Sequence, residues 1–168
     1  MKRLFMILVA ALSMGTTALA DEGNGRIQMG VGLLYKNGMD MTIAYEYETH
    51  YHNAWEFFGN AYLQWEDCLS CGHICPESFW KSYNSWGMGV AYKPCVVRGR
   101  NNHGSLRLGG SLGTDRHDVL GGIHIGYEHS YSLRKGWQLF WQVKNDVMIG
   151  GKDLFRTGIV IGIKIPTK

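Results

Sequence analysis

Apolar and polar side chains alternate with a period of two residues in one segment after another of this 168-residue chain. Such alternation is typical of β-strands whose two faces meet different surroundings. In residues 26–35, for example, Ile27, Met29 and Val31 share one face, while Arg26 and Gln28 lie on the other. The pattern predicts eight strands, at residues 26–35, 39–48, 54–66, 85–92, 105–112, 119–128, 137–146 and 155–165.

The connections between these segments are mostly short, and no segment has a sustained helical period. Asn37-Gly38 separates the first two segments, and Asn-Gly is the strongest short signal for a β-hairpin. Lys93 to His103 forms a polar connection between the fourth and fifth segments. An even number of strands in this order predicts an all-β fold, an eight-stranded antiparallel up-and-down barrel.

The N-terminus has the features of a cleaved signal peptide. Lys2 and Arg3 precede a short apolar core at residues 4–12, and Ala18-Leu19-Ala20 matches the small-x-small pattern of a cleavage site. We therefore expect a signal peptide at residues 1–20, cleavage after Ala20, and a single barrel domain at residues 21–168. Export through a Sec-type signal makes the outer membrane available to the mature chain.

The apolar faces of the eight segments contain no Lys, Arg, Asp or Glu. A charge that faces hydrocarbon at mid-bilayer costs roughly 2–4 kcal/mol, so contact with lipid would enforce such an exclusion. The sequence therefore predicts a barrel in the outer membrane, with lipid around the apolar face. A soluble calyx that binds an apolar ligand inside is the alternative.

The opposite faces combine many glycines with charged residues. An eight-stranded barrel has room inside only for its own side chains, so glycines would make space for longer neighbours. The charges are close to balance, five cations against six anions: Arg26, Arg107, Lys144, Arg156 and Lys164 against Asp40, Glu46, Glu48, Glu56, Glu128 and Asp146. This predicts a self-neutralising plug rather than an ion-selective pore.

The net charge argues against nucleic-acid binding. The formal charge of +3 falls to about +1 when the two cations of the signal segment are removed. A nucleic-acid-binding domain needs a dense basic face, so we expect no direct contact with DNA or RNA. No motif indicates a cofactor.

Four cysteines are the candidate site residues. Cys68-x-x-Cys71-x-His73-x-Cys75 lies between the third and fourth predicted strands, and Cys95 follows the fourth. Thiolates and imidazoles at this spacing can bind zinc, but an exported chain meets an oxidising compartment. We therefore favour a structural disulfide in a loop over a metal site. Cys95 would lie a barrel height away from the other three, which favours pairing within the loop and leaves one thiol over.

His124, Glu128 and Ser130 share one face of the sixth predicted strand. Residues four and six apart on a strand are roughly 13–20 Å from each other, so we expect these three to make no direct contact and to form no catalytic set. A barrel enzyme would need serine, histidine and an acidic residue that meet across adjacent strands. We therefore predict no catalytic residue and a chain that is not an enzyme.

The chain resembles the conjugal transfer protein TraO family of Bacteroidetes conjugative transposons. The resemblance rests on GMGVAYK at residues 87–93, GGSLG at 109–113, GGIHIGYE at 121–128, FRTGIVIGIK at 155–164 and the early Tyr-Lys-Asn-Gly hairpin at 35–38. It implies an outer-membrane component of a conjugative DNA-transfer apparatus, structural or accessory, with other conjugal transfer proteins as partners. A general surface or integrity barrel, and less so a lipid-modifying barrel enzyme, are the alternatives.

Overall fold

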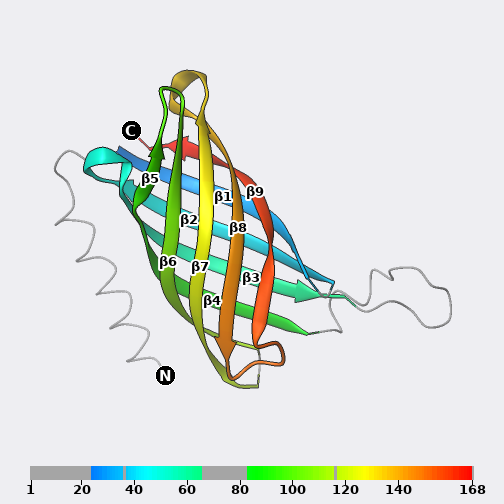
Figure 1. Ribbon diagram of the computed structural model, residues 1–168. Helices are drawn as coiled ribbons and strands as arrows, with labels where there is room; N and C mark the ends of the chain where they lie inside the picture. Colours follow the sequence, from blue (N-terminus) through cyan, green and yellow to red (C-terminus); the bar gives the residue numbers. More distant parts are fainter. Residues whose placement is uncertain (1–23, 36, 66–82, 116, 168) are drawn as a thin grey trace, which may run out of the picture.

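The computed structural model describes residues 24–35, 37–65, 83–115 and 117–167 (Figure 1). The expected signal peptide and Cys68, Cys71 and Cys75 lie outside the described residues. Within the described ranges the strands are β1 (Asn24–Leu34), β2 (Gly38–Glu48), β3 (Ala54–Gln64), β4 (Asn84–Lys93), β5 (Cys95–Arg98), β6 (Asn102–Thr114), β7 (Val119–Ser132), β8 (Gln138–Ile149) and β9 (Phe155–Pro166). Short 3-10 turns occupy His50–His52 and Arg134–Gly136. None of the described helices is long and apolar enough to cross a membrane.

The strands form a closed antiparallel barrel. Neighbours in sequence pair with each other except β4 and β5, β1 pairs with β9, and β4 pairs with β6, which closes the sheet. β5 continues the line of β4 after Pro94, a residue without an N–H to donate to the ladder. β4 and β5 therefore count as one interrupted strand of eight, and the prediction of an eight-stranded antiparallel barrel is confirmed.

The sequence was wrong about the polar connection at residues 93–103. Cys95–Arg98 is strand β5, and β6 already begins at Asn102. Lys93, which we placed in the connection, is the last residue of β4 and is almost fully buried. Few apolar residues mark this hairpin, because it continues past the ends of β2 and β3 and its contacts there are polar or aromatic, with residues 51–53 and Ser132.

The two faces of the sheet point as predicted. Ile43 is 65 % exposed and Ile161 is 64 % exposed, whereas Glu46 on the other face of β2 is 2 % exposed. The apolar stripe therefore lies outside and the charged stripe inside. A soluble calyx requires the reverse arrangement, so this alternative is contradicted by the direction of the side chains.

Glycines on the inner face of β4 and β7 make room for large neighbours, as predicted. A Cβ atom on Gly89 would lie 2.5 Å from the ring of Phe58, and one on Gly122 would lie 2.6 Å from Ser111 Oγ. Side chains at these positions would clash with the lumen residues. The Asn-Gly hairpin is also confirmed, with Asn37 at φ 56°, in the left-handed region.

The barrel has two different ends. β1 begins and β9 ends at the same end, where Arg26 is opposite Pro166, and we call this the terminal end. The β2–β3, β5–β6 and β7–β8 connections also lie there, whereas strands β1, β3, β6 and β8 end at the opposite end. In Figure 1 the β5–β6 hairpin and the β7–β8 connection extend beyond the rest of the terminal end.

Candidate functional site

The largest group of charged side chains lies inside the barrel, toward the terminal end. Lys93 Nζ lies 2.7 Å from Glu46 and 2.8 Å from Glu128, and it is also ion-paired with Glu56. It donates a further hydrogen bond of 3.0 Å to Gln28 Oε1. One ammonium group therefore joins residues from four strands, β1, β2, β3 and β7.

Two more cations complete this group, which we call the Lys93 cluster: Lys93, Lys164, Arg107, Glu46, Glu56 and Glu128. Lys164 Nζ lies 2.7 Å from Glu46 and 2.6 Å from Glu128. Arg107 Nη2 lies 2.7 Å from Glu56. Each carboxylate therefore contacts two cations, and three positive groups balance three negative ones.

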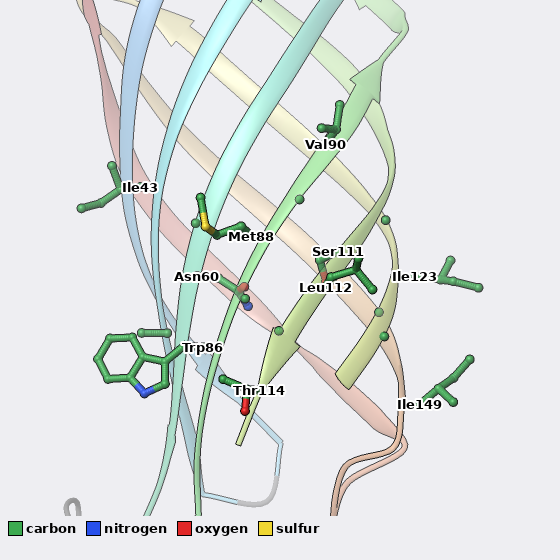
Figure 2. A pocket seen from close by; sticks show the side chains of 18 of the residues that line it. Ile43, Asn60, Trp86, Met88, Val90, Ser111, Leu112, Thr114, Ile123 and Ile149 are labelled. Carbon is green, nitrogen blue, oxygen red and sulfur yellow. The ribbon is translucent and has the colours of Figure 1, made fainter. Parts of the chain in front are cut away.

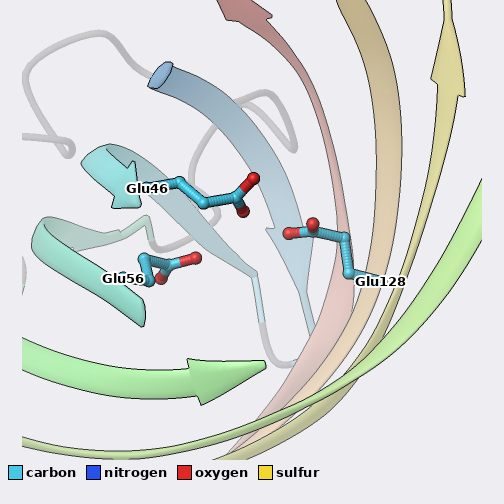
Figure 3. Close-up of side chains that lie close together, drawn as sticks. All are labelled: Glu46, Glu56 and Glu128. Carbon is cyan, nitrogen blue, oxygen red and sulfur yellow. The ribbon is translucent and has the colours of Figure 1, made fainter. Parts of the chain in front are cut away.

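The three glutamates of the cluster come close enough to suggest a metal site, because one carboxylate oxygen from each lies within 4.8 Å of the others (Figure 3). The ammonium of Lys93 already contacts all three. A divalent cation would have to displace it and leave an excess of buried positive charge, which is costly at low dielectric. The geometry therefore supports an internal ion-pair cluster and not a metal centre.

A second group, the Asp146 cluster, lies further toward the opposite end: Asp40, Ser111, His124, Lys144 and Asp146. Lys144 Nζ contacts Asp40 at 2.6 Å and Asp146 at 2.8 Å. His124 places Nδ1 2.8 Å from Asp146 Oδ1 and Nε2 2.6 Å from Ser111 Oγ. The Nδ1–Oδ1 contact is at ion-pair distance but lacks hydrogen-bond geometry, since both atoms are without a hydrogen-bond partner.

The Asp146 cluster is what sequence reasoning missed. We expected His124, Glu128 and Ser130 to make no contact with one another, but Ser130 Oγ donates to Glu128 at 3.4 Å, so the expectation is wrong for that pair. His124 instead contacts Ser111 on β6 and Asp146 on β8. The cross-strand register brings these three residues together, because Asp146 pairs directly with His124, and Ser111 pairs with Gly122.

The charge balance of the lumen is closer than the sequence suggested. Lys93 joins the five predicted cations, so six cations face six anions among the described residues. Arg26 pairs with Glu48 at the mouth of the terminal end, and the guanidinium of Arg156 stacks 4.0 Å from the ring centre of Tyr62. The equal numbers of cations and anions in the lumen agree with the predicted self-neutralising plug.

The described part of the outer surface includes a broad apolar hollow, with a volume of about 1320 Å³ (Figure 2). Its lining includes Trp86 and the small residues Gly59, Ala61, Gly110 and Gly121. A Cβ atom on Gly121 would meet no other atom within 4 Å, so this part of the surface is open. A groove of this kind accommodates apolar chains.

The exposed charges differ between the ends. Arg98, Arg100, Arg134 and Lys135 are exposed at the terminal end. Asp115, Asp118 and Asp153 lie in the described connections of the opposite end, together with Lys152. There the backbone N–H groups of Asp118 and His117 donate to the Asp115 carboxylate and lower its pKa.

Cys95 is the candidate site residue that the structure describes. It lies at the terminal end, whereas Gln64 and Asn84, which flank residues 65–83, lie at the opposite end. Its thiol is free and donates to the carbonyl oxygen of Val97 at 3.3 Å. Pairing among the other three cysteines stays a prediction.

No family model matches the chain, and no curated protein matches it in sequence. Solved structures with the same fold include Neisserial surface protein A, with 11% identity, 86% of this chain and 96% of that chain covered, and a TM-score of 0.60. A major outer membrane protein from Thermus thermophilus has 10% identity, 87% and 100% coverage, and a TM-score of 0.59. The Yersinia pestis outer membrane protein Ail has 11% identity, 86% and 100% coverage, and a TM-score of 0.56.

These likenesses define the class of fold. The chain folds as a closed eight-stranded barrel of the kind found in small outer-membrane proteins. At 10% to 11% identity the likeness concerns the arrangement of strands and not any particular activity.

Proposed function

We propose that this chain is an outer-membrane protein that serves as a structural or accessory, non-catalytic component of a conjugative DNA-transfer apparatus. The observation that carries the membrane part is the charge-free apolar exterior around a buried ionic lumen. In lipid every backbone polar group must be paired within the protein, and the closed ladder of eight strands satisfies this requirement. Outer-membrane lipid is therefore the first partner.

The transfer role rests on the resemblance to the TraO family. The residues that carry it lie on β4, β6, β7 and β9, and on the turn between β1 and β2. The Lys93 and Asp146 clusters occupy the lumen, so transferred DNA does not pass through this barrel. The protein would act through its two ends, where other conjugal transfer proteins would bind.

Deletion of the gene from a donor strain tests this proposal. We expect the frequency of transfer to fall and to recover when the intact gene is supplied in trans. The matched control is a donor carrying the Ile43→Val variant, a conservative change on the outer wall of the barrel and away from both ends. Unchanged transfer in the deletion strain would contradict the role, and a weakened envelope instead would indicate the general surface or integrity barrel.

One specific observation favours a second candidate, a lipid-ester hydrolase. Ser111, His124 and Asp146 meet across three adjacent strands in the order that serine hydrolases use, hydroxyl to Nε2 and Nδ1 to carboxylate. In this scheme Ser111 Oγ would attack an ester carbonyl while its proton moves to His124 Nε2. The alcohol would leave with that proton, and water would release the acid from the serine.

This candidate is tested with purified barrel in detergent micelles and the chromogenic ester p-nitrophenyl butyrate. Hydrolysis that is lost in Ser111→Ala, together with labelling of Ser111 by a fluorophosphonate, would establish the enzyme. Ser130→Ala is the matched control, because Ser130 contacts Glu128. If the original protein, Ser111→Ala and Ser130→Ala all hydrolyse the ester at the same background rate, the non-catalytic role is left.

A further inference from the structure

The β5–β6 hairpin has an open edge. β5 pairs with β6 on one side only, and β3, the neighbour of β4, ends its pairing at Lys93 opposite Ala54. At the start of β5, Cys95 N–H donates to the side chain of Asn53 at 2.9 Å. The guanidinium of Arg98 also lies 5.2 Å from the ring centre of Tyr51, in the turn between β2 and β3. Beyond these two contacts, an edge strand presents backbone N–H and C=O groups to whatever lies beside it.

The hairpin extends beyond the barrel wall and is held in place by contacts with its neighbours, among them the stacked rings of His103 and His52. Arg98 lies five residues beyond Lys93, which corresponds to about 16 Å of extended chain. Ser132 N–H, at the end of β7, donates to Asn101 in the β5–β6 turn at 2.8 Å. A hydrogen bond from Gly99 N–H to Asn102 closes the turn itself at 2.8 Å. The edge is therefore presented by an ordered hairpin.

The surroundings of this edge are basic. Arg98 and Arg100 lie on and just after β5, and Arg134 and Lys135 lie across β6 from it, in the β7–β8 turn, all of them exposed. Among the described residues, β5 and the three connections at the terminal end contain no Asp or Glu. The nearest acid along β2, Glu48, is ion-paired with Arg26 and His52. Val96 and Val97 add exposed apolar surface.

We propose that this basic edge (β5 with Arg98, Arg100, Arg134 and Lys135) binds an extended acidic segment of a partner protein, which adds to β5 as a further strand. Main-chain hydrogen bonds would supply affinity and the cations would select the partner. A second copy of this chain is disfavoured, because like charges at Arg98 and Arg100 would meet. A lipid surface would satisfy the cations but not the strand edge.

The proposal states which kind of partner binds at the terminal end, and it does not depend on the transfer role. It is tested with the full barrel in nanodiscs of phosphatidylcholine and a fluorescent ten-residue peptide of alternating Glu and Val. We expect binding by fluorescence anisotropy, and an affinity about ten-fold lower for the Arg98→Glu/Arg100→Glu variant. A charge reversal at the opposite end, Asp118→Lys, is the matched control and should bind as the original does.

A second probe isolates the strand edge. N-methylation of alternate peptide bonds removes N–H donors from the peptide and keeps its charge, so we expect binding to be lost. Equal binding of the methylated peptide, or equal binding by the double variant, would overturn the proposal. Absence of peptide binding together with capture of phosphatidylglycerol vesicles would assign the edge to a membrane surface and would overturn it as well.

Discussion

The Lys93 cluster and the Asp146 cluster both neutralise buried charges, but they differ in how many polar atoms are left without a hydrogen-bond partner. In the Lys93 cluster each of three glutamates contacts two cations. In the Asp146 cluster one lysine serves two aspartates, and Asp40 Oδ1, His124 Nδ1 and Asp146 Oδ1 have no hydrogen-bond partner. The Lys93 cluster has one such atom, Glu56 Oε2, which is ion-paired with Lys93, so the first cluster is more nearly saturated than the second. Buried polar groups left unsatisfied in this way occur more often where a structure has a task besides stability.

The largest effect is expected for Lys93→Met. The change leaves three buried glutamates around an apolar side chain, and loss of one partner from a buried ion pair costs about 4 kcal/mol. We expect the urea midpoint of unfolding, followed by tryptophan fluorescence in detergent micelles, to fall sharply. A stability equal to that of the exposed control Lys135→Met would show that the cluster does not hold the barrel together.

A smaller loss is expected for Lys144→Met. This lysine contacts two carboxylates instead of three, and His124 stays beside one of them, so the loss should be about 3 kcal/mol. The same urea titration measures it. A loss greater than that of Lys93→Met would reverse the ranking of the two clusters.

Ser111→Ala should change stability by only about 1 kcal/mol, the net contribution of one hydrogen bond. The variant removes the hydroxyl that contacts His124 Nε2 and leaves the ionic contacts in place. Thermal unfolding by circular dichroism measures the change. A loss as large as that of Lys144→Met would mean that Ser111 is a structural member of the cluster.

Arg98→Glu/Arg100→Glu should alter stability least, by within about 0.5 kcal/mol, because both side chains are exposed at a projecting turn. Heat-modifiable migration on a gel should be unchanged. A destabilised barrel would show that these arginines support the fold and are not free to bind a partner.

The sequence predicted most of the fold, because the alternation of apolar and polar residues and the absence of charges from one face are visible within each short segment. It correctly placed Ile43 and Glu46 on opposite faces of the sheet, and it correctly predicted the Asn37-Gly38 hairpin. It missed β5 and the burial of Lys93, because a hairpin held by polar and aromatic contacts needs no apolar pattern. It also missed the contact of His124 with Ser111 and Asp146, since cross-strand register depends on how the sheet closes and not on spacing along one strand.

The central claim is that the apolar exterior contacts acyl chains. Vesicles of phosphatidylcholine with brominated acyl chains test it directly, because bromine quenches only the tryptophans that touch it. The account predicts strong quenching, and a smaller quenched fraction in Trp86→Phe, since Trp86 is 51 % exposed on the outer face. Fluorescence that is unaffected by brominated lipid, with the protein recovered in the aqueous phase, would contradict it.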